Sequence, residues 1–309
     1  MYDAVVVGGG PAGLSAAQQL ARACATTLVL DAGVPRNARA QHVNGYAGLD
    51  RVPLPVFRER LRDDLTRYPE VELAEAWVDR VNRQDEGGFT VWAGDRSWQA
   101  RRVLLATGVV DVLPDLPDVD AYWGTSVVQC PFCHGWEART RPAAVVIGDD
   151  VLLAEMLRFH GRWATSLVAL AAPGWEPTST AREVLGAAGV SLHEAPVVAL
   201  HGHDGVLQEL EFADGSTADV GTVYVHNEQR PTDLVRVLGL DLTFGAYVAV
   251  RKDYAVPDPT LPLFVTSVPG IYAAGDATST AQAAQLAAFE GALAARRMVL
   301  DHAFTDPGR

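Results

Sequence analysis

The chain has 309 residues, of which 49% are hydrophobic and 20% charged, with a net charge of −13 and three cysteines. This composition predicts a globular protein of two domains, and its acidic balance argues against nucleic acid or an anionic membrane surface as a partner. The first residues lack the basic segment of a signal peptide, and no apolar run approaches the roughly 20 residues of a membrane-spanning helix. We therefore expect a cytoplasmic protein with no membrane contact.

The amino-terminal stretch predicts a nucleotide-binding turn. An apolar strand over residues 4–7 is followed by Gly8-Gly9-Gly10-Pro11-Ala12-Gly13. In this GxGxxG motif the first glycine permits a tight turn, the second lets a pyrophosphate approach the backbone, and the third lets the following helix pack closely. After a helix to about Arg22, a strand over 27–30 ends at Asp31, which is placed to accept hydrogen bonds from a ribose hydroxyl. The glycines alone could form an ordinary turn, but the order strand, turn, helix, strand and acid favours a dinucleotide site.

Two later segments have the same strand-and-turn character. An apolar strand ends in the turn Ala106-Thr107-Gly108, and another ends in Gly275-Asp276, before a helix expected from about Gln282 to Leu300. Together with the first turn, these segments resemble the flavoproteins that have two dinucleotide-binding domains. The resemblance implies that FAD is bound, that residues 106–108 close the FAD domain, and that Asp276 binds the ribitol and phosphate. A helix N-cap is a compatible alternative for Asp276.

A second α/β unit lies between Gly108 and Gly270, and its nucleotide turn is altered. Between expected strands over 143–147 and 165–171, the chain reads Gly148-Asp149-Asp150-Val151-Leu152-Leu153, with a helix from 151 to about 160. Asp150 stands at the second glycine of the motif, where its carboxylate would oppose a pyrophosphate by size and by charge. No basic residue follows the second strand until Arg182, whereas NADPH-dependent relatives have arginines there. We expect this domain to keep the fold and to have lost its nucleotide; weak NADH binding is the alternative.

A pair of cysteines lies inside this unit, in the sequence Cys130-Pro131-Phe132-Cys133-His134. Because proline suits the first position of a helix, Cys130 is expected at the N-cap and Cys133 in the first turn. The positive end of a helix favours the thiolate that attacks disulfides. Zinc would need two further ligands that the sequence does not supply, so no metal is predicted. A c-type haem signature is a minor alternative, and Cys24 is expected to be a small core residue.

The order of these motifs along the whole chain resembles the low-molecular-weight thioredoxin reductases. Residues 35–37, 130–137 and 275–278 are similar to a side branch that contains the dithiol oxidases of gliotoxin- and holomycin-type natural products. The resemblance implies that Cys133 lies against the flavin and passes electrons to it, while Cys130 exchanges with the substrate. His134 replaces an acid of the reductases, and an imidazole suits accepting a thiol proton; a helix-packing role is the alternative.

Further cofactor contacts are expected from the same resemblance. One group follows the ribose-binding acid or lies in the loop that meets the isoalloxazine; a surface turn is the alternative for His42. A second group comprises a valine whose backbone would contact adenine and a glutamine whose side chain would bond the flavin pyrimidine. These expected contacts are Arg36, Asn37, His42, Asn44, Val78 and Gln282.

The predicted fold is α/β, with two Rossmann-like dinucleotide-binding domains. A discontinuous FAD-binding domain is expected over 1–114 and 247–309, with an irregular loop at 257–262, and a central pyridine nucleotide-type domain over 115–246. The predicted function is FAD-dependent oxidation of a dithiol to a disulfide through Cys130 and Cys133, with oxygen or another acceptor and without NADPH. The alternatives are an NAD(P)H-dependent thioredoxin reductase, a ferredoxin-linked reductase and a flavin redox sensor without turnover. The partner is a small dithiol or a thioredoxin-like protein, and the resemblance implies a homodimer.

Overall fold

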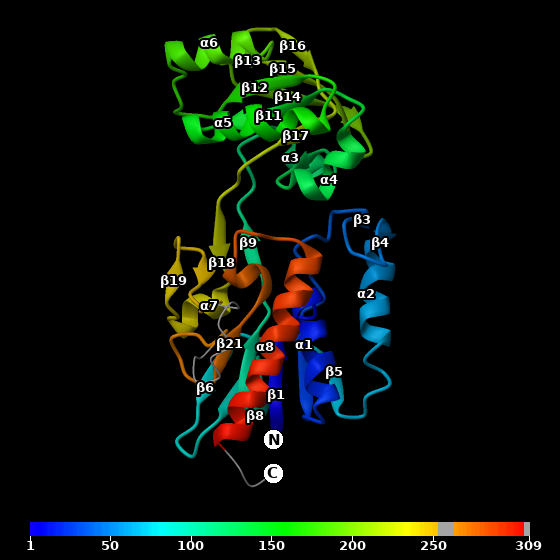
Figure 1. Ribbon diagram of the computed structural model, residues 1–309, viewed down its shortest axis with the longest axis vertical. Coiled ribbons are helices and arrows are strands. Elements are labelled where there is room, and N and C mark those ends of the chain that lie inside the picture. Colours follow the sequence, from blue (N-terminus) through cyan, green and yellow to red (C-terminus); the bar gives the residue numbers. More distant parts are fainter. Residues whose placement is uncertain (253–262, 306–309) are drawn as a thin grey trace. The chain divides into compact units, whose positions relative to one another are not determined.

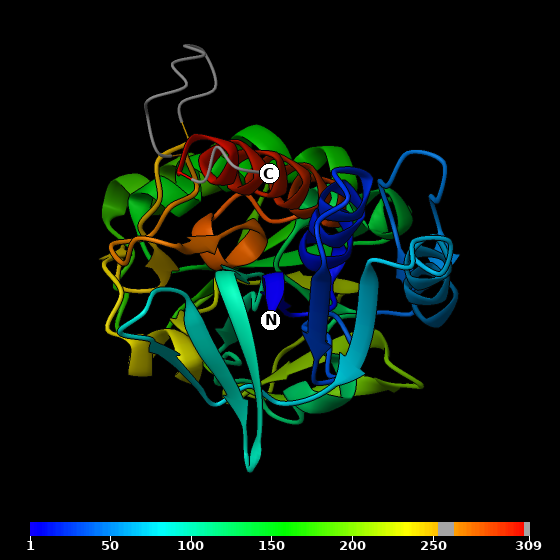
Figure 2. The same cartoon turned by 90° about the horizontal axis from the view of Figure 1, so that it is seen from below.

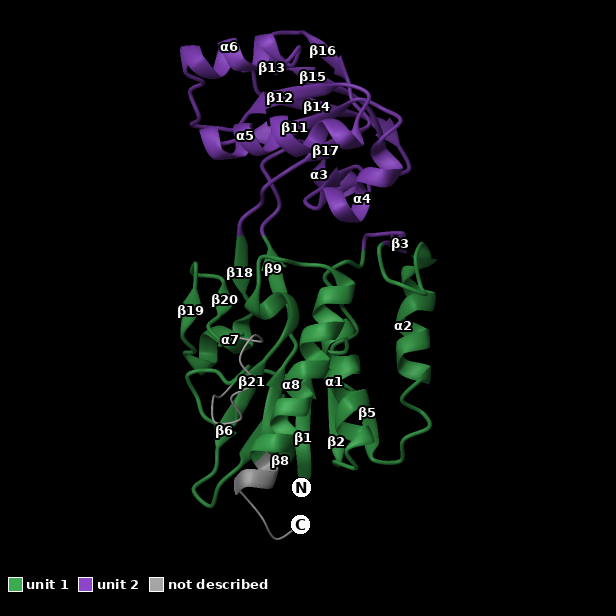
Figure 3. Cartoon of the chain, in the orientation of Figure 1, with its two compact units in different colours: residues 1–38, 45–111, 229–309 green, residues 39–44, 112–228 purple. Residues whose placement is uncertain are grey.

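A computed structural model describes residues 1–252 and 263–305, and the expected loop at 257–262 lies outside them. The chain forms two compact units: unit 1 comprises residues 1–38, 45–111 and 229–309, and unit 2 comprises residues 39–44 and 112–228 (Figure 3). The predicted domains, 1–114 with 247–309 and 115–246, differ from these units in residues 39–44, 112–114 and 229–246. Residues 229–246 belong to unit 1 because β18 (Gln229–Pro231) pairs with β9 (Val109–Asp111) and α7 (Asp233–Leu238) packs on its core. The nucleotide bound by each domain stays a prediction.

Unit 1 is built on a seven-stranded sheet in the order β5-β2-β1-β8-β7-β6, with β21 also paired to β8 (Figure 1). The long strand β8 pairs antiparallel with β7 near its start and parallel with β1 and β21 along its second half. The strands of unit 1 are β1 (Tyr2–Val7), β2 (Thr27–Asp31), β4 (Val52–Pro53), β5 (Val71–Glu75), β6 (Arg80–Arg83), β7 (Phe89–Ala93), β8 (Arg96–Leu105), β9, β18, β19 (Leu242–Thr243), β20 (Tyr247–Val248) and β21 (Ile271–Ala273).

Helices cover one face of this sheet. α1 (Pro11–Arg22) and α8 (Ala284–Thr305) lie side by side along it (Figures 1 and 2). Because side chains alternate along a strand, Ala4 and Val6 of β1 pack with these helices, while Val5 and Val7 pack on the opposite face with α7. The other helices of unit 1 are α2 (Leu54–Asp63) and the 3₁₀ helix η2 (Gly275–Thr278).

Unit 2 contains a five-stranded parallel sheet in the order β10-β17-β11-β12-β13 and a three-stranded antiparallel sheet, β14-β15-β16. Leu153 and Leu185 come from helices on one face of the parallel sheet, and Leu207 and Phe212 come from the antiparallel sheet on the other. Its elements are β3 (His42–Val43), α3 (Val119–Tyr122), β10 (Val127–Val128), α4 (Pro131–Ala138), β11 (Ala143–Ile147), α5 (Asp150–Phe159), η1 (His160–Trp163), β12 (Leu167–Ala171), α6 (Ser179–Ala187), β13 (Ser191–His193), β14 (Val197–His203), β15 (Val206–Phe212), β16 (Thr217–Asp219) and β17 (Thr222–Tyr224).

The expectation that Cys24 is a core residue is wrong. The predicted helix end at Arg22 is confirmed, but Cys24 follows it in the left-handed conformation (φ 57°) and is exposed. Its N–H donates to the carbonyl oxygen of Ala21 at 2.8 Å, as is common where a chain leaves a helix. The residue therefore closes the helix end and does not pack inside.

Among the described helices, none is long and apolar enough to cross a membrane.

Small residues allow α1 and α8 to approach closely. A Cβ atom at Gly291 of α8 would overlap the carbonyl oxygen of Ala12 in α1, and Ala16 and Ala294 are fully buried in the same layer. The two helices belong to opposite ends of the chain. Their contact therefore joins the amino-terminal nucleotide turn to the carboxyl-terminal part of unit 1.

We expect Gly291→Ala to destabilise the protein by about 1–3 kcal/mol, because the added methyl group must push two packed backbones apart. Gly186→Ala in α6 is the matched control, since its Cβ would meet no atom within 4 Å. That variant should be neutral or stabilising by up to about 1 kcal/mol through helix propensity. Urea unfolding followed by circular dichroism measures both. Equal stabilities for the two variants would contradict the close packing of α1 on α8.

Candidate functional site

The turn between β1 and α1 has the geometry of a phosphate cradle. A Cβ atom at Gly8, whose φ is 111°, would overlap the carbonyl oxygen of Ala106, and one at Gly13 would overlap the carbonyl oxygen of Gly8. At Gly10 the same atom would meet nothing within 4 Å. Gly10 is the N-cap of α1 and Pro11 its first residue, with no side-chain cap and no acid in the first turn. The first N–H groups of α1 therefore face open space, as an anion site requires.

Asp31 ends β2, as predicted, but its carboxylate has protein partners that the sequence analysis missed. Oδ2 accepts Nη2 of Arg58 at 3.0 Å and also pairs with Arg62, both from α2. Oδ1 accepts the N–H of Gly33 at 3.2 Å. These residues line a hollow of about 610 Å³ between α2 and the ends of β2 and β5. The two arginines thus fix Asp31 and leave Oδ1 as the oxygen suited to a ribose hydroxyl.

The expected adenine contact, Val78, lies in the segment that follows β5, whose backbone is hydrogen-bonded to that of Asp31. Ala76 donates its N–H to the carbonyl oxygen of Asp31 at 3.1 Å, so the segment after β5 is tied to the end of β2. Val78 is buried within this segment, whereas Trp77 is exposed. The position is compatible with a backbone contact to adenine, which stays a prediction.

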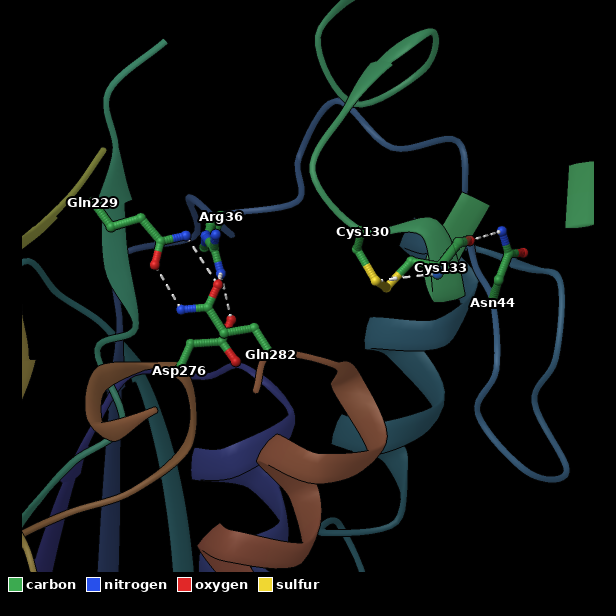
Figure 4. The surroundings of a disulfide bond; sticks show 7 residues. All are labelled: Arg36, Asn44, Cys130, Cys133, Gln229, Asp276 and Gln282. Atoms are coloured by element: carbon green, nitrogen blue, oxygen red, sulfur yellow. Dashed lines mark hydrogen bonds and ion pairs between the residues drawn. A yellow bond between two sulfur atoms is a disulfide. The ribbon is translucent and has the colours of Figure 1, made fainter. Parts of the chain in front are cut away.

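Arg36 joins Asp111, Asp276 and Gln282 in one network, of which Figure 4 draws Arg36, Asp276 and Gln282. Its guanidinium makes two bonds of 2.7 Å to the carboxylate of Asp111, one of 2.8 Å to Oδ2 of Asp276 and one of 2.6 Å to Oε1 of Gln282. Burial raises the pKa of Asp276, and the charge of Arg36 acts against that rise. Gln282 was the predicted start of the last helix, but α8 begins two residues later, at Ala284. The arginine therefore bridges two carboxylates in a partly buried place.

Gln229 and Tyr247 extend this network. Nε2 of Gln229 donates to Asp111 and to Gln282, both at 3.0 Å, and the hydroxyl of Tyr247 donates to Oε1 of Gln229 at 2.7 Å. The sequence analysis named Arg36, Asp276 and Gln282 but missed Asp111, Gln229 and Tyr247. The only sequence signal for Asp111 was its place shortly after the turn at Gly108.

The remaining predicted contacts of unit 1 lie in turns. Ala106 donates its N–H to the carbonyl oxygen of Val7 at 2.8 Å, and Gly108 has φ 64°. Oγ1 of Thr107 lies 3.3 Å from Oγ1 of Thr232. Asn37 is exposed in the turn after Arg36. The segment at 106–108 thus packs on the glycine turn, while no bond to another residue is recorded for Asn37.

The cysteine pair forms a disulfide with the predicted helix geometry. Cys130 and Cys133 are joined with their Cα atoms 5.2 Å apart, Cys130 is the N-cap of α4, and Pro131 is its first residue (Figure 4). The N–H of Cys133 donates to Sγ of Cys130 at 3.1 Å. This donor and the positive helix end favour a thiolate on Cys130 when the disulfide is open.

Asn44 and His134 flank this pair within unit 2. Nδ2 of Asn44 donates to the carbonyl oxygen of Cys133 at 2.8 Å, and its Oδ1 is buried without a hydrogen-bond partner. Burial lowers the pKa of His134, only partly offset by hydrogen bonding to the backbone of Cys130 and by the charge of Glu137. Nδ1 of His134 is also buried without a partner. His42, at the start of β3, is exposed. Flavin contacts of His42 and Asn44 stay predictions.

The altered turn of unit 2 leads into a helix whose end is already occupied by acids. Asp149 is the N-cap of α5 and accepts the N–H of Leu152 at 2.8 Å, and Asp150 is the first residue of the helix. Both carboxylates are exposed. Arg182, the first base after β12, is paired with Glu194. In residues 1–252 and 263–305, no group of three or more His, Cys, Asp or Glu side chains could hold a metal ion.

Known proteins resemble this chain over nearly its whole length. A family described as pyridine nucleotide-disulphide oxidoreductase matches residues 2–291. The chain is 30% identical to thioredoxin reductase aclD of Aspergillus oryzae, covering 100% of this chain and 99% of that protein. It is 32% identical to thioredoxin reductase tcpT of Claviceps purpurea, covering 95% and 92%. The predicted thioredoxin reductase resemblance is therefore confirmed.

Solved structures agree with this fold. TrxB of Bacillus anthracis has a TM-score of 0.88 at 28% identity and covers 99% of this chain and 100% of that one. HlmI has a TM-score of 0.83 at 31% identity and covers 98% and 92%. The predicted α/β fold of the low-molecular-weight thioredoxin reductase architecture is confirmed.

We expect Arg36→Met to lower the free energy of unfolding by about 3 kcal/mol, because the change removes the guanidinium that bridges the carboxylates of Asp111 and Asp276. The raised pKa of Asp276 means that its ionisation opposes folding, so the loss should be larger at pH 8 than at pH 5, where the carboxyl is more protonated. Arg39→Met is the control, since its pair with Asp120 is 50% and 71% exposed. Urea unfolding at both pH values measures the effect. A loss independent of pH would contradict the network.

Proposed function

The chain belongs to the pyridine nucleotide-disulphide oxidoreductase family, and we propose that it oxidises a dithiol to a disulfide through Cys130 and Cys133 without taking electrons from NADPH. The observation that carries this proposal is the contrast between its two nucleotide turns. The first glycine turn leads into α1 without an acid, whereas α5 begins with Asp149 and Asp150. One turn is suited to a pyrophosphate and the other repels it.

FAD is the cofactor of this family, and the residues of unit 1 fit it. The open position at Gly10 leaves room for a pyrophosphate against the start of α1. We assign the ribose to Oδ1 of Asp31, and the ribityl and ring end of the cofactor to the network of Arg36, Asp276 and Gln282. When bound, FAD supplies a two-electron acceptor that passes the electrons on to oxygen or to another acceptor.

The second nucleotide turn argues against NADPH as the donor. A pyrophosphate at the start of α5 would meet the carboxylate of Asp150 in place of bare backbone, and the cap of Asp149 already takes the N–H of Leu152. The 2′-phosphate would find no free base at the end of β12, because Arg182 is paired with Glu194. Neither the start of α5 nor the end of β12 thus offers the groups that bind the nucleotide in a pyridine nucleotide domain.

The reaction then begins at the Cys130–Cys133 disulfide. A substrate thiolate attacks Sγ of Cys130, the bond to Cys133 breaks, and Cys133 leaves as a thiolate. The second substrate thiol attacks the mixed disulfide, so the substrate closes its own disulfide and Cys130 is released. The substrate has lost two electrons and two protons, and the cysteine pair has gained the electrons. The pair would return to the disulfide once a two-electron acceptor bound by unit 1 has taken these electrons.

His134 is suited to accept one of these protons. Burial lowers its pKa, so the imidazole is neutral at pH 7, and Nδ1 has no hydrogen-bond partner in the part of the chain that the structure describes. A neutral imidazole beside the exchanging cysteine acts as a general base for the attacking thiol. As carried over from the resemblance, the substrate is a small dithiol or a thioredoxin-like protein, and the protein is a cytoplasmic homodimer.

Anaerobic mixing with reductants tests the electron donor. We expect NADPH at millimolar concentration to leave the bound flavin oxidised, while dithiothreitol bleaches its absorbance near 450 nm, because only the dithiol can reach it through the cysteine pair. Cys130→Ser is the control, in which dithiothreitol should no longer bleach the flavin rapidly. The names of the relatives favour a thioredoxin reductase as the second candidate, and NADPH is the electron donor that we assign to it. Rapid stoichiometric bleaching by NADPH would establish that candidate and exclude ours.

The pH dependence of dithiol oxidation tests His134. A general base acts when it is deprotonated, so the rate should fall as the pH drops through the pKa of His134, which lies below its ordinary value of 6.5. We expect His134→Gln to slow the reaction about a hundredfold and to remove this acidic limb. His201→Gln, at an exposed histidine paired with Glu211, is the control and should keep it. An unchanged acidic limb in His134→Gln would assign the limb to another group.

A further inference from the structure

Glu290 is a buried carboxylate in the second turn of α8 that no motif of the sequence indicated. The residue is 9% exposed, and its Oε1 pairs with Nζ of Lys252 at 2.7 Å. Burying an ion pair of this kind costs desolvation energy, so the residues are not expected there for stability alone. The role of Glu290 follows from the partners of its other carboxylate oxygen, Oε2.

Oε2 of Glu290 binds both ends of the turn that contains Asp276. It accepts the N–H of Gly275 at 2.9 Å and lies 3.0 Å from Oγ1 of Thr278. Oγ1 of Thr278 is also 2.8 Å from the carbonyl oxygen of Gly275. These contacts close η2 as a small ring of hydrogen bonds around Asp276.

The backbone of this turn needs such support. Gly275 has φ 76°, and a Cβ atom there would lie 2.8 Å from Cβ of Ala12 in α1. The turn is therefore packed against the start of α1 on one side and bonded to Glu290 on the other. A shift of the turn would move Asp276 away from Arg36, which it meets at 2.8 Å.

We propose that Glu290 is a positioning residue for the cofactor, holding the turn at 275–278 so that Asp276 and Arg36 keep their arrangement, with Lys252 as its counter-ion. This inference rests on the assignment of Asp276 to the FAD site in the proposed function. The group does not touch the cofactor itself. It acts through the amide of Gly275 and the hydroxyl of Thr278.

The test is the dissociation constant of FAD, measured by flavin fluorescence on titration of deflavinated protein, for the variants Glu290→Ala and Glu290→Gln. Hydrogen bonds to a charged group are strong, so we expect Glu290→Ala to weaken FAD binding about tenfold or more. Glu290→Gln keeps an oxygen that can accept from Gly275 and should recover part of this loss. The midpoint potential of the bound flavin is a second readout, because a moved Asp276 changes the charge near the cofactor.

A matched control lies on the same helix. Asp301 pairs with Arg297 at 2.6 Å, with side chains 18% and 10% exposed, close to the 12% and 21% of Glu290 and Lys252. Asp301→Asn should therefore cost comparable stability and leave the FAD dissociation constant unchanged. An equal loss of FAD affinity in both variants, or none in Glu290→Ala, overturns the inference.

Asp276→Asn separates this inference from the proposed function. If Asp276→Asn leaves FAD binding unchanged, the assignment of Asp276 to the cofactor fails. If Asp276→Asn weakens it and Glu290→Ala does not, only the role of Glu290 fails. Should Glu290→Ala not fold, Lys252→Met decides the question: it removes the cation that holds Glu290, so a weakened affinity supports the inference and an unchanged one overturns it.

Discussion

Unit 1 depends on backbone contacts at the start of α1 that leave no room for side chains. Cβ atoms at Gly8 and Gly13 would overlap neighbouring carbonyl oxygens, and one at Gly291 would overlap the carbonyl oxygen of Ala12. These close approaches hold the first turn of the chain between β8 and the far helix α8. A discontinuous unit needs such a contact, because its segments are separated along the chain by all of unit 2. The same contacts expose the N–H groups of α1 to a phosphate.

The two units share one architecture but differ in the charge of the residues at a helix start. In both, a parallel strand leads through a turn into a helix, and a helix start of this kind attracts anions. α1 keeps that attraction, since it has a glycine N-cap and no early acid. In α5 the N-cap is Asp149 and the first helical residue is Asp150. The side chain of Asp149 accepts the N–H of Leu152, which is one of the donors that a phosphate would use. Unit 2 thus keeps the strand, turn and helix although acids stand at the start of α5, because strand and helix packing do not require a glycine at position 150.

Local sequence patterns predicted much of this site, but they could not predict the side-chain partners that lie far away in the sequence. The glycine turn, the acid ending β2 and the proline-started helix of Cys130 follow from steric and capping rules that act within a few residues. Arg36 was named, but its strongest partner, Asp111, is 75 residues away. Likewise, Arg58 and Arg62 reach Asp31 only because α2 packs near the end of β2. The junction predicted between residues 246 and 247 differs from the unit boundary at 229 for the same reason, since the pairing of β18 with β9 joins residues that are far apart in the sequence.

The state of the proton at the cysteine pair bears on the direction of the reaction. Oxidising a dithiol releases two protons, whereas reducing a disulfide consumes them, so the group beside the exchanging cysteine has opposite tasks in the two cases. An acid with a pKa raised toward neutrality suits the reduction. Burial instead lowers the pKa of His134, and among the described residues its buried Nδ1 has no hydrogen-bond partner. Because this pKa lies below its ordinary value of 6.5, the imidazole is neutral at pH 7 and is able to accept a proton from a thiol. Our proposal assigns His134 to the oxidation of a dithiol for this reason.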